Sequence, residues 1–297
     1  MNGILCVNKP SGWTSFDVVA KVRGMARTKK VGHAGTLDPM ATGILPLFFG
    51  TATKACDVMP NDNKGYVATF RFGMTTDTLD ITGNVQSQTE SHITEAQLRA
   101  LLPSFLGEID QIPPMFSAVQ VNGRRLYDIA RSGAEVERKA RRVNILKLKL
   151  LEFSEEEQTA VVEVLCSKGT YIRTLCSDIG EKLGVGATLT ALNRHIVGNF
   201  TLDDCYTMEQ LQAFTDAGVL DEKALPVEKV FEQFPKIKLN EVQSIKFRNG
   251  VKLDLNRVRY KNVDGLHKVF DQKNQFMGLA RLNLETMELI VEKMFFR

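Results

Sequence analysis

Residues 31–43 read Val-Gly-His-Ala-Gly-Thr-Leu-Asp-Pro-Met-Ala-Thr-Gly. Three glycines, one proline and a single carboxylate, Asp38, in so short a span indicate a loop of fixed conformation from which that side chain projects. Catalytic groups are commonly found on loops that a rigid scaffold positions. The alternative is a turn aspartate whose carboxylate only caps backbone amides. The composition of the loop does not decide between these two roles.

The sequence before this loop predicts one strand and one helix. Residues 4–7 are apolar and typical of a short buried strand. Ser15 is a suitable N-cap for a helix whose apolar positions include Val18, Val19 and Val22. The loop that carries Asp38 therefore follows a compact strand and helix unit.

The sequence after the loop alternates between strand and helix signals. Residues 66–72, 146–150 and 161–165 have the alternation or β-branched content of strands. Thr94 and Gln97 form a capping box for a helix through Leu102 that Pro103 ends. A second helix follows Gly169, with apolar residues at four-residue spacing up to Gly184: Leu175, Ile179 and Leu183.

These elements predict an α+β fold, because helices and strands are interspersed without a regular βαβ rhythm. We expect a mixed, mostly antiparallel sheet in a body that spans residues 1–230. Strand-like runs at residues 251–255 and 288–294 predict a small β-rich C-terminal domain over residues 235–297.

Length and composition predict a soluble, cytoplasmic protein. The chain has 297 residues, of which 43% are hydrophobic, and no run approaches the roughly 18 apolar residues of a membrane helix. Its start lacks the pattern of an export signal. Five scattered cysteines without a C-x-x-C pair favour neither disulfides nor zinc, and four histidines offer no metal-ligand spacing. We therefore expect no metal site and no membrane association.

Positive charge is concentrated in two parts of the chain. The ratio of Lys and Arg to Asp and Glu is 9 to 3 in residues 121–149 and 13 to 7 in residues 235–297, although the net charge is only +3. Such local positive charge would favour binding of a polyphosphate partner, because Lys and Arg neutralise phosphates and release their counterions. Solvated surface is an equally good interpretation of the charge alone.

Five stretches together indicate a family. In chain order they are residues 7–12, 31–43, 64–66 leading into 73–80, 113–118 and 167–173. They resemble the bacterial tRNA pseudouridine-55 synthases, the B family of pseudouridine synthases, and the resemblance covers residues 3 to about 200. It implies a pseudouridine-synthase fold and the isomerisation of uridine to pseudouridine at position 55, in the T loop of tRNA. It also implies tRNA, through its T arm, as the partner.

The resemblance identifies Asp38 as the catalytic aspartate. The reaction breaks the N1–C1′ bond of uridine, rotates the base and joins C5 to C1′, without redox change, so we expect no cofactor. An ionised carboxylate can add to the sugar, add to the base or assist elimination to a glycal. By the same resemblance Arg173 pairs with Asp38, and we expect this pairing to lower the pKa of the carboxyl group. Read alone, Arg173 is a solvated residue early in a helix.

The resemblance assigns the remaining residues to RNA binding. Tyr66 stacks on the target base, Tyr171 and Leu192 line the same pocket, and His33 inserts into the T loop as the nucleotide is extracted. Spacing alone would place the first three in the core. Lys9 is grouped with the substrate-binding residues and is interpreted as loop support near the active site. A basic insertion near residues 114–142 closes over RNA and supplies the backbone-contacting residues Arg124, Arg125, Arg131, Arg141 and Arg142.

Three alternatives are distinguishable by experiment. An RNA chaperone or binding module would need only the basic segments. An N-glycoside hydrolase would release free uracil, and such enzymes generally use two carboxylates, whereas the loop offers only Asp38. The guide-RNA-dependent relatives of archaea and eukaryotes would need a guide and partner proteins. Because the body resembles the stand-alone type, we expect a monomer that needs no guide RNA.

Overall fold

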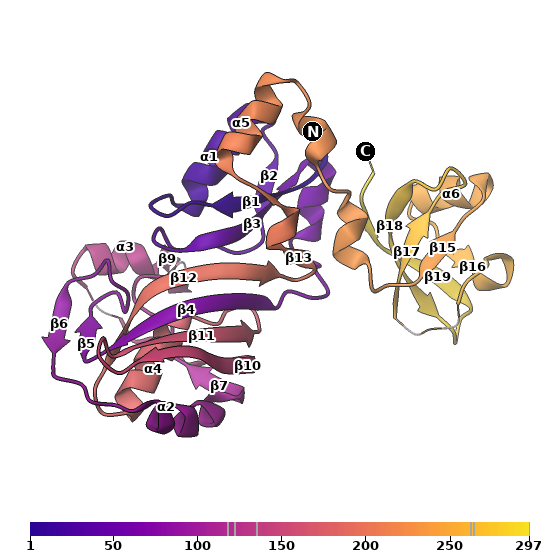
Figure 1. Ribbon diagram of the computed structural model, residues 1–297. Helices are drawn as coiled ribbons and strands as arrows, with labels where there is room; N and C mark the ends of the chain where they lie inside the picture. The colour runs from indigo at the N-terminus through magenta and orange to yellow at the C-terminus, as the bar shows by residue number, and fades with distance from the viewer. Residues whose placement is uncertain (118, 122, 135, 262, 264, 297) are drawn as a thin grey trace.

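A ten-stranded sheet forms the body of the protein (Figure 1). The computed structural model describes residues 1–117, 119–121, 123–134, 136–261, 263 and 265–296, with only the backbone of Arg125. The main path of the sheet is β14-β1-β3-β12-β4-β11-β10-β7, and β2 and β13 pair with β3 and β12. Its strands are β1 (Gly3–Lys9), β2 (Val31–His33), β3 (Thr42–Phe49), β4 (Lys64–Phe72), β7 (Gly107–Gln111), β10 (Arg141–Ser154), β11 (Thr159–Cys166), β12 (Ala187–Val197), β13 (Phe200–Thr201) and β14 (Cys205–Tyr206).

The predicted mixed, mostly antiparallel sheet is confirmed. Among its described pairs only β1 with β14 and β3 with β12 are parallel. The strands are accompanied by two small hairpins, β5 (Met74–Thr76) with β6 (Val85–Gln88) and β8 (Gln120–Val121) with β9 (Arg124–Arg125). The helices are α1 (Ser15–Met25), α2 (Glu95–Leu101), α3 (Leu126–Arg131), α4 (Ile172–Lys182), α5 (Met208–Asp216) and α6 (Glu241–Arg248).

The largest core lies between the long strands and helices α2 and α4. Along β4 the alternate residues Tyr66, Ala68, Phe70 and Phe72 are buried, as the period-2 pattern requires. They belong to the same apolar cluster as Leu175, Ile179 and Leu98 of the two helices. Complete burial of a side chain such as Phe70 stabilises the fold by about 2 kcal/mol. This packing fixes the start of α4 against the sheet.

Two local predictions need correction. Helix α1 is capped by Thr14 and not by Ser15, because the Thr14 hydroxyl accepts a hydrogen bond from the Asp17 amide at 3.1 Å, and the Asp17 carboxylate accepts from the Thr14 amide. Ser15 is buried and its hydroxyl is used elsewhere, as described below. In β10 a register shift turns Leu146 outward while Leu150 stays buried, so the leucines of this strand do not share one face.

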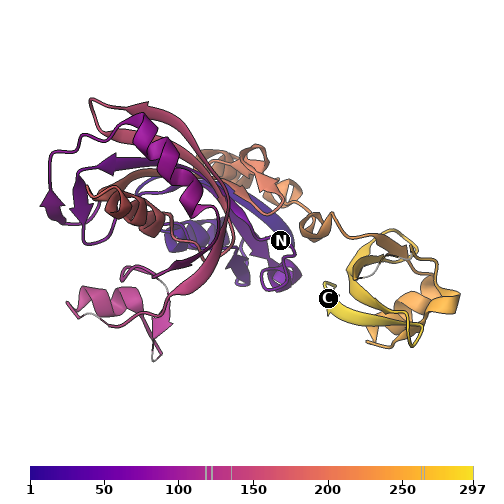
Figure 2. The same cartoon turned by 90° about the horizontal axis from the view of Figure 1, so that it is seen from below.

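The predicted β-rich C-terminal domain is confirmed as a five-stranded sheet that stands beside the body in both views (Figures 1 and 2). Its strands are β15 (Lys236–Lys238), β16 (Leu253–Asp254), β17 (Leu266–Phe270), β18 (Phe276–Asn283) and β19 (Glu288–Met294). Leu279 and Phe295 of this domain pack in one apolar cluster with Phe231, Ile4 and Phe48. The carbonyl of Phe295 also accepts a hydrogen bond from the hydroxyl of Thr51 at 2.7 Å. The end of the chain is thus part of the core beside β1 and β3.

The loop that carries Asp38 connects β2 to β3, and its exit is fixed by close backbone contact. Gly43, the second residue of β3, has a φ of +103°. A Cβ atom at this position would lie 2.2 Å from the carbonyl oxygen of Arg194 on the adjacent strand β12. Only glycine permits this approach. The parallel contact of β3 with β12 therefore sets where the loop ends and β3 begins.

Candidate active site

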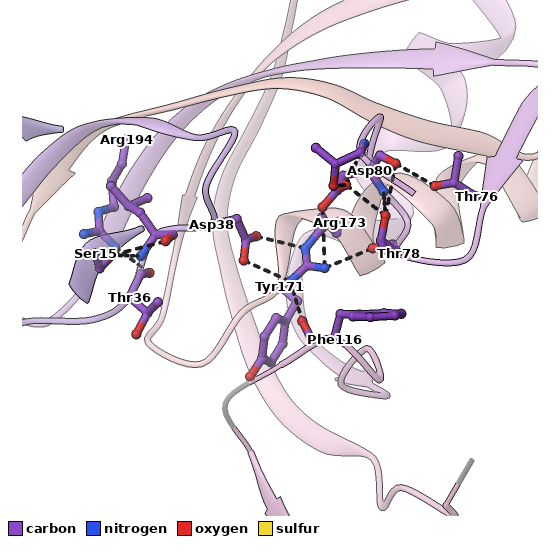
Figure 3. Close-up of polar contacts among 12 residues, drawn as sticks. Ser15, Thr36, Asp38, Thr76, Thr78, Asp80, Phe116, Tyr171, Arg173 and Arg194 are labelled. Atoms are coloured by element: carbon purple, nitrogen blue, oxygen red, sulfur yellow. Dashed lines mark hydrogen bonds and ion pairs between the residues drawn. The ribbon is translucent and has the colours of Figure 1, made fainter. Parts of the chain in front are cut away.

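Asp38 and Arg173 form a two-point ion pair, although they are 135 residues apart in the chain (Figure 3). Nε of Arg173 lies 2.9 Å from Oδ2 of Asp38, and Nη2 donates to Oδ1 at 3.1 Å. Such parallel contacts fix both the distance and the plane of the carboxylate. Arg173 is the second residue of α4 and is only 4% exposed, whereas the Asp38 side chain is 31% exposed. The carboxylate is therefore held by a buried cation and remains accessible.

Arg173 also binds two other segments. Its Nη1 donates to the carbonyl of Thr78 at 2.9 Å and lies 3.6 Å from Oδ2 of Asp80. Its Nη2 donates to the carbonyl of Phe116 at 2.8 Å, at the root of residues 114–142, which we call the basic segment. Figure 3 shows the guanidinium between these groups. One side chain thus joins the loop that carries Asp38, the turn after β5 and the basic segment.

Asp80 is a second carboxylate at this centre, and it is buried. Its Oδ1 accepts hydrogen bonds from the hydroxyls of Thr78 and Thr82 at 2.9 and 2.5 Å, and from the amide of Thr82 at 3.0 Å. The N-terminus of a helix such as α4 favours negative charge and disfavours the positive charge of Arg173. The carboxylates of Asp38 and Asp80 compensate for this. Asp80 consequently acts as the inner counter-ion that holds Arg173 in place.

Ser15 and Lys9 also hold the loop around Asp38, through hydrogen bonds to its backbone. The Ser15 hydroxyl accepts from the amide of Leu37 at 2.8 Å and donates to its carbonyl at 3.1 Å. The Lys9 ammonium is completely buried and donates to the carbonyls of Pro10, Trp13 and Pro39. Lys9 therefore holds the backbone of this region through three carbonyls, one of which, that of Pro39, belongs to the Asp38 loop.

Arg194 holds the other side of the loop. Its side chain is completely buried, and its guanidinium donates to the carbonyls of Gly35 at 3.1 Å, Thr36 at 3.3 Å and Ile44 at 2.9 Å. Three carbonyls are unusual partners for a buried guanidinium, which normally pairs with a carboxylate. The charge of Arg194 also acts on the phenol of Tyr66. Arg194 thus connects the aspartate loop to the tyrosine of the cavity.

The Asp38–Arg173 pair opens onto a cavity of about 600 Å³. Its lining contains six of the predicted site residues: Asp38, Arg173, Tyr66, Tyr171, Leu192 and His33. Gln111 holds the backbone of Tyr171: the Gln111 side chain accepts a hydrogen bond from the Tyr171 amide and donates one to the Tyr171 carbonyl. The volume is in the range of sites that enclose small organic ligands. The structure therefore brings together in one place the residues that the sequence assigned to chemistry and base binding.

Burial dominates the ionisation of this site. Burial raises the pKa of Asp38, the charge of Arg173 lowers it by less, and the charge of Asp80 raises it further. Arg173 thus lowers the pKa of Asp38 as expected, but the net pKa lies above its ordinary value, because desolvation of the carboxylate outweighs the guanidinium. Burial lowers the pKa of His33, which favours the neutral imidazole. Burial raises the pKa of Tyr66 to about 12, so its phenol is protonated at neutral pH.

Four of the five arginines assigned to RNA backbone contact lie outside this cavity: Arg124, Arg131, Arg141 and Arg142. Arg124 and Arg131 are exposed in the basic segment, and Arg131 lies over the ring of Tyr127 at 5.5 Å. Arg141 and Arg142 are exposed at the start of β10, where Arg142 lies 3.7 Å from Glu108 and 3.5 Å from Asp110. The side chain of Arg125 lies outside the described residues.

Comparison with known families assigns the chain. Residues 23–172 match the model of the TruB family pseudouridylate synthase N-terminal domain, and residues 173–232 match the tRNA pseudouridylate synthase B C-terminal domain. The chain belongs to the TruB family of pseudouridylate synthases. Curated relatives agree over nearly the full length of this pseudouridylate synthase. The tRNA pseudouridine synthase B of Clostridium perfringens strain 13 is 44% identical over 284 residues, 95% of each chain. That of Clostridioides difficile strain 630 is 39% identical and covers 99% of this chain and 100% of its own.

Solved structures confirm the fold of the synthase. A chain in a Cbf5-Nop10-Gar1 complex aligns with a TM-score of 0.75 at 24% identity, covering 99% of this chain and 85% of its own. A chain in an H/ACA RNP bound to a substrate RNA containing 2′-deoxyuridine aligns with the same TM-score at 23% identity. At these identities the likeness establishes the pseudouridine-synthase fold alone. Among the described residues, no helix has the length and apolar character needed to cross a membrane.

Sequence reasoning did not identify Asp80 and Arg194 as site residues. Asp80 lies at the end of the stretch 73–80 that helped to indicate the family, but nothing local shows that it faces Arg173. Arg194 offered a signal, since alternation along the strand places it on the same face as the buried Leu192. An arginine on a core-facing position of a strand indicates a buried polar contact.

Arg194 is expected to position the loop without touching substrate. Replacing it with glutamine leaves carbonyls of Gly35 and Thr36 without donors, and we expect kcat to fall about 100-fold, the effect of a misplacement of about 1 Å. Binding of tRNA should change little, because Arg194 offers its donors to the loop. Single-turnover kinetics and a binding isotherm measure the two quantities separately. A change in KM with an unaltered kcat would contradict a positioning role.

Proposed function

We propose that this pseudouridylate synthase modifies uridine 55 in the T loop of tRNA and that Asp38 is the catalytic carboxylate. The observation that carries the proposal is the accessible Asp38 carboxylate, held at two points by Arg173 and facing the cavity lined by Tyr66 and Leu192. Curated relatives named tRNA pseudouridine synthase B support the isomerisation of uridine to pseudouridine in tRNA.

The proposed chemistry uses only groups of the protein and the substrate. The N1–C1′ bond breaks, the detached uracil rotates in the cavity, and C5 bonds to C1′; C5 loses a proton and N1 gains one. No electron is transferred overall, so the reaction needs no redox cofactor. The ring of Tyr66 would stack on the uracil and hold it during rotation. Attack on the sugar, attack on the base and assistance of glycal formation all require the Asp38 carboxylate to be ionised.

The cavity favours isomerisation over hydrolysis. A glycosidase would place two carboxylates on either side of the scissile bond. Asp80 is buried on the far side of Arg173 and does not line the cavity, whereas Asp38 does. Asp57 and Asp62 also line the cavity, and Asp62 is paired with Lys168 at 2.8 Å. Asp38 is the carboxylate of the cavity that Arg173 holds at two points. A detached uracil held against Tyr66 and Leu192 would be retained for the second bond.

The RNA would be bound by residues around the cavity. His33 would enter the space left by the extracted nucleotide, with Tyr171 beside it. The basic segment would contact phosphates through Arg124, Arg125, Arg131, Arg141 and Arg142. Residues 1–230 would form the catalytic domain and residues 235–297 a small RNA-binding domain. The protein would act in the cytoplasm as a monomer without guide RNA or membrane.

Turnover of a bare T-arm hairpin tests the proposed function. With uridine labelled with tritium at C5, the purified protein should release tritium and leave pseudouridine at position 55, without guide RNA or another protein. A matched hairpin with cytidine at position 55 should release none. Free uracil as product would indicate a hydrolase, and binding without any product would indicate an RNA-binding module. A requirement for guide RNA would contradict stand-alone activity.

A further inference from the structure

Lys64 is a cation in the wall of the cavity, and the proposed chemistry assigns it no role. It is the first residue of β4, two positions before Tyr66, so alternation along the strand directs both side chains to the same face. The cavity lining includes both residues and Asp38. The Lys64 ammonium donates to the carbonyl of Asp62 at 3.1 Å. One described partner leaves two of its three donors unused.

Two of the carboxylates that line the cavity are already paired within the protein, whereas Asp57 lines it without an ion pair among the described residues. Asp38 is paired with Arg173 at 2.9 Å, and Asp62 is paired with Lys168 at 2.8 Å. Lys64 has no carboxylate within 4.0 Å among the described residues. Burial lowers the pKa of Lys64 and the nearby charge of Arg194 lowers it further, whereas the charge of Asp62 raises it by less. A partly buried ammonium whose neighbouring carboxylate Asp62 is paired with Lys168 is poorly neutralised, and an anion that enters the cavity would stabilise it.

The chemistry of the substrate limits what this anion can be. Uracil and ribose are uncharged at neutral pH, so a nucleotide within RNA carries its negative charge on phosphate. We propose that Lys64 binds a backbone phosphate directly flanking the extracted uridine. The inference rests on the proposed function and adds to it a contact that anchors the target nucleotide. Anchoring the backbone leaves the detached base free to rotate at Tyr66.

The geometry of the cavity agrees with this arrangement. Two residues along a strand span roughly 6.6 Å, and Lys64 and Tyr66 are separated by this distance along the backbone of β4. Lys64 packs near Gly35, where an added Cβ atom would lie 3.1 Å from its Cε and 3.6 Å from Nη1 of Arg194. Gly35 has a φ of +91°, which favours glycine and keeps this space open. The phosphate would lie at the Gly35 end of the loop and the sugar at Asp38.

Replacing Lys64 with glutamine tests the proposal through its salt dependence. Each phosphate contact contributes about 0.7 to 0.9 to the slope of log affinity against log salt concentration. We expect the slope for the T-arm hairpin to fall by about that amount, and affinity at low salt to fall about tenfold. The rate of a single turnover at saturating protein should change little. Lys147→Gln is the matched control, since it removes one exposed lysine paired with Glu163 outside the cavity.

A hairpin with one neutral methylphosphonate linkage identifies the phosphate. The modification flanking position 55 should weaken binding to the unaltered protein and cause no further loss with Lys64→Gln. An unchanged salt slope, or the same methylphosphonate penalty in both proteins, would overturn the proposal. If Lys64→Gln lowers the melting temperature, Lys64→Arg must keep the slope and Lys64→Met must lose it. An unaltered protein that binds the hairpin without making pseudouridine would refute the proposed function instead.

Discussion

Replacing Asp38 with asparagine is expected to lower turnover by at least about 10⁴-fold, because loss of a nucleophilic or charge-bearing catalytic group has effects of this order. Asparagine has nearly the same shape and can still contact Arg173, but it cannot ionise. All three routes proposed for the carboxylate need the negative charge. Tritium release from a T-arm hairpin labelled at C5 of uridine 55 measures the loss.

Binding of the hairpin by Asp38→Asn should remain close to that of the unaltered protein, since the proposed phosphate contacts lie elsewhere. The matched control is Asp17→Asn, which removes an exposed carboxylate from the capping box of α1 and should leave turnover unchanged. Turnover by Asp38→Asn within tenfold of the unaltered protein would exclude Asp38 as the catalytic group. Equal loss of binding and turnover would point to a disturbed loop.

Replacing Arg173 with methionine is expected to lower both stability and activity. The change leaves Asp80 buried without its cation, and breaking a buried pair by removing one partner costs about 3 kcal/mol or more. It also frees the carbonyls of Thr78 and Phe116. Urea unfolding at pH 7 measures the loss in free energy of unfolding. Turnover should be undetectable, because Asp38 loses both of its contacts with Arg173.

The stability deficit of Arg173→Met should depend on pH. Arg173 lowers the pKa of Asp38, so its removal raises this pKa further above the ordinary value of 3.8. A carboxyl group whose pKa is raised by folding destabilises the native state once it ionises, and this cost vanishes below the unfolded-state pKa. The deficit should therefore shrink as pH falls through the raised pKa of Asp38 towards 3.8. Adding Asp80→Asn should restore part of the stability but no turnover.

Periodic features of the sequence predicted most of the body of the fold. The alternation of residues 66–72 and the four-residue spacing of Leu175 and Ile179 correspond to β4 and α4, because these patterns reflect burial on one face. The family resemblance gathered six residues that line one cavity. The N-cap of α1 was misplaced by one residue, since Thr14 and Ser15 have the same capping group and only the tertiary contact of Ser15 with Leu37 separates them.

The contacts that hold the catalytic loop could not be predicted in the same way. Arg194 and Thr36 are 158 residues apart, and neither residue reveals which carbonyl or donor the fold will bring to it. The net direction of the Asp38 pKa could not be predicted for a related reason, although Arg173 does lower this pKa. The sequence shows an arginine beside the aspartate by family resemblance, but desolvation depends on how deeply the folded chain encloses both groups.

The packing of Phe295 and Leu279 against Phe231 and Ile4 affects how a shortened chain should be understood. Removal of the C-terminal sheet would remove the aromatic side chains that pack against β1, and apolar side chains that are now buried would become exposed to water. A truncated enzyme would therefore be damaged as well as smaller. Weaker RNA binding by such a fragment would combine lost contacts with a loosened catalytic body, and single substitutions on the outer surface of the sheet would separate the two.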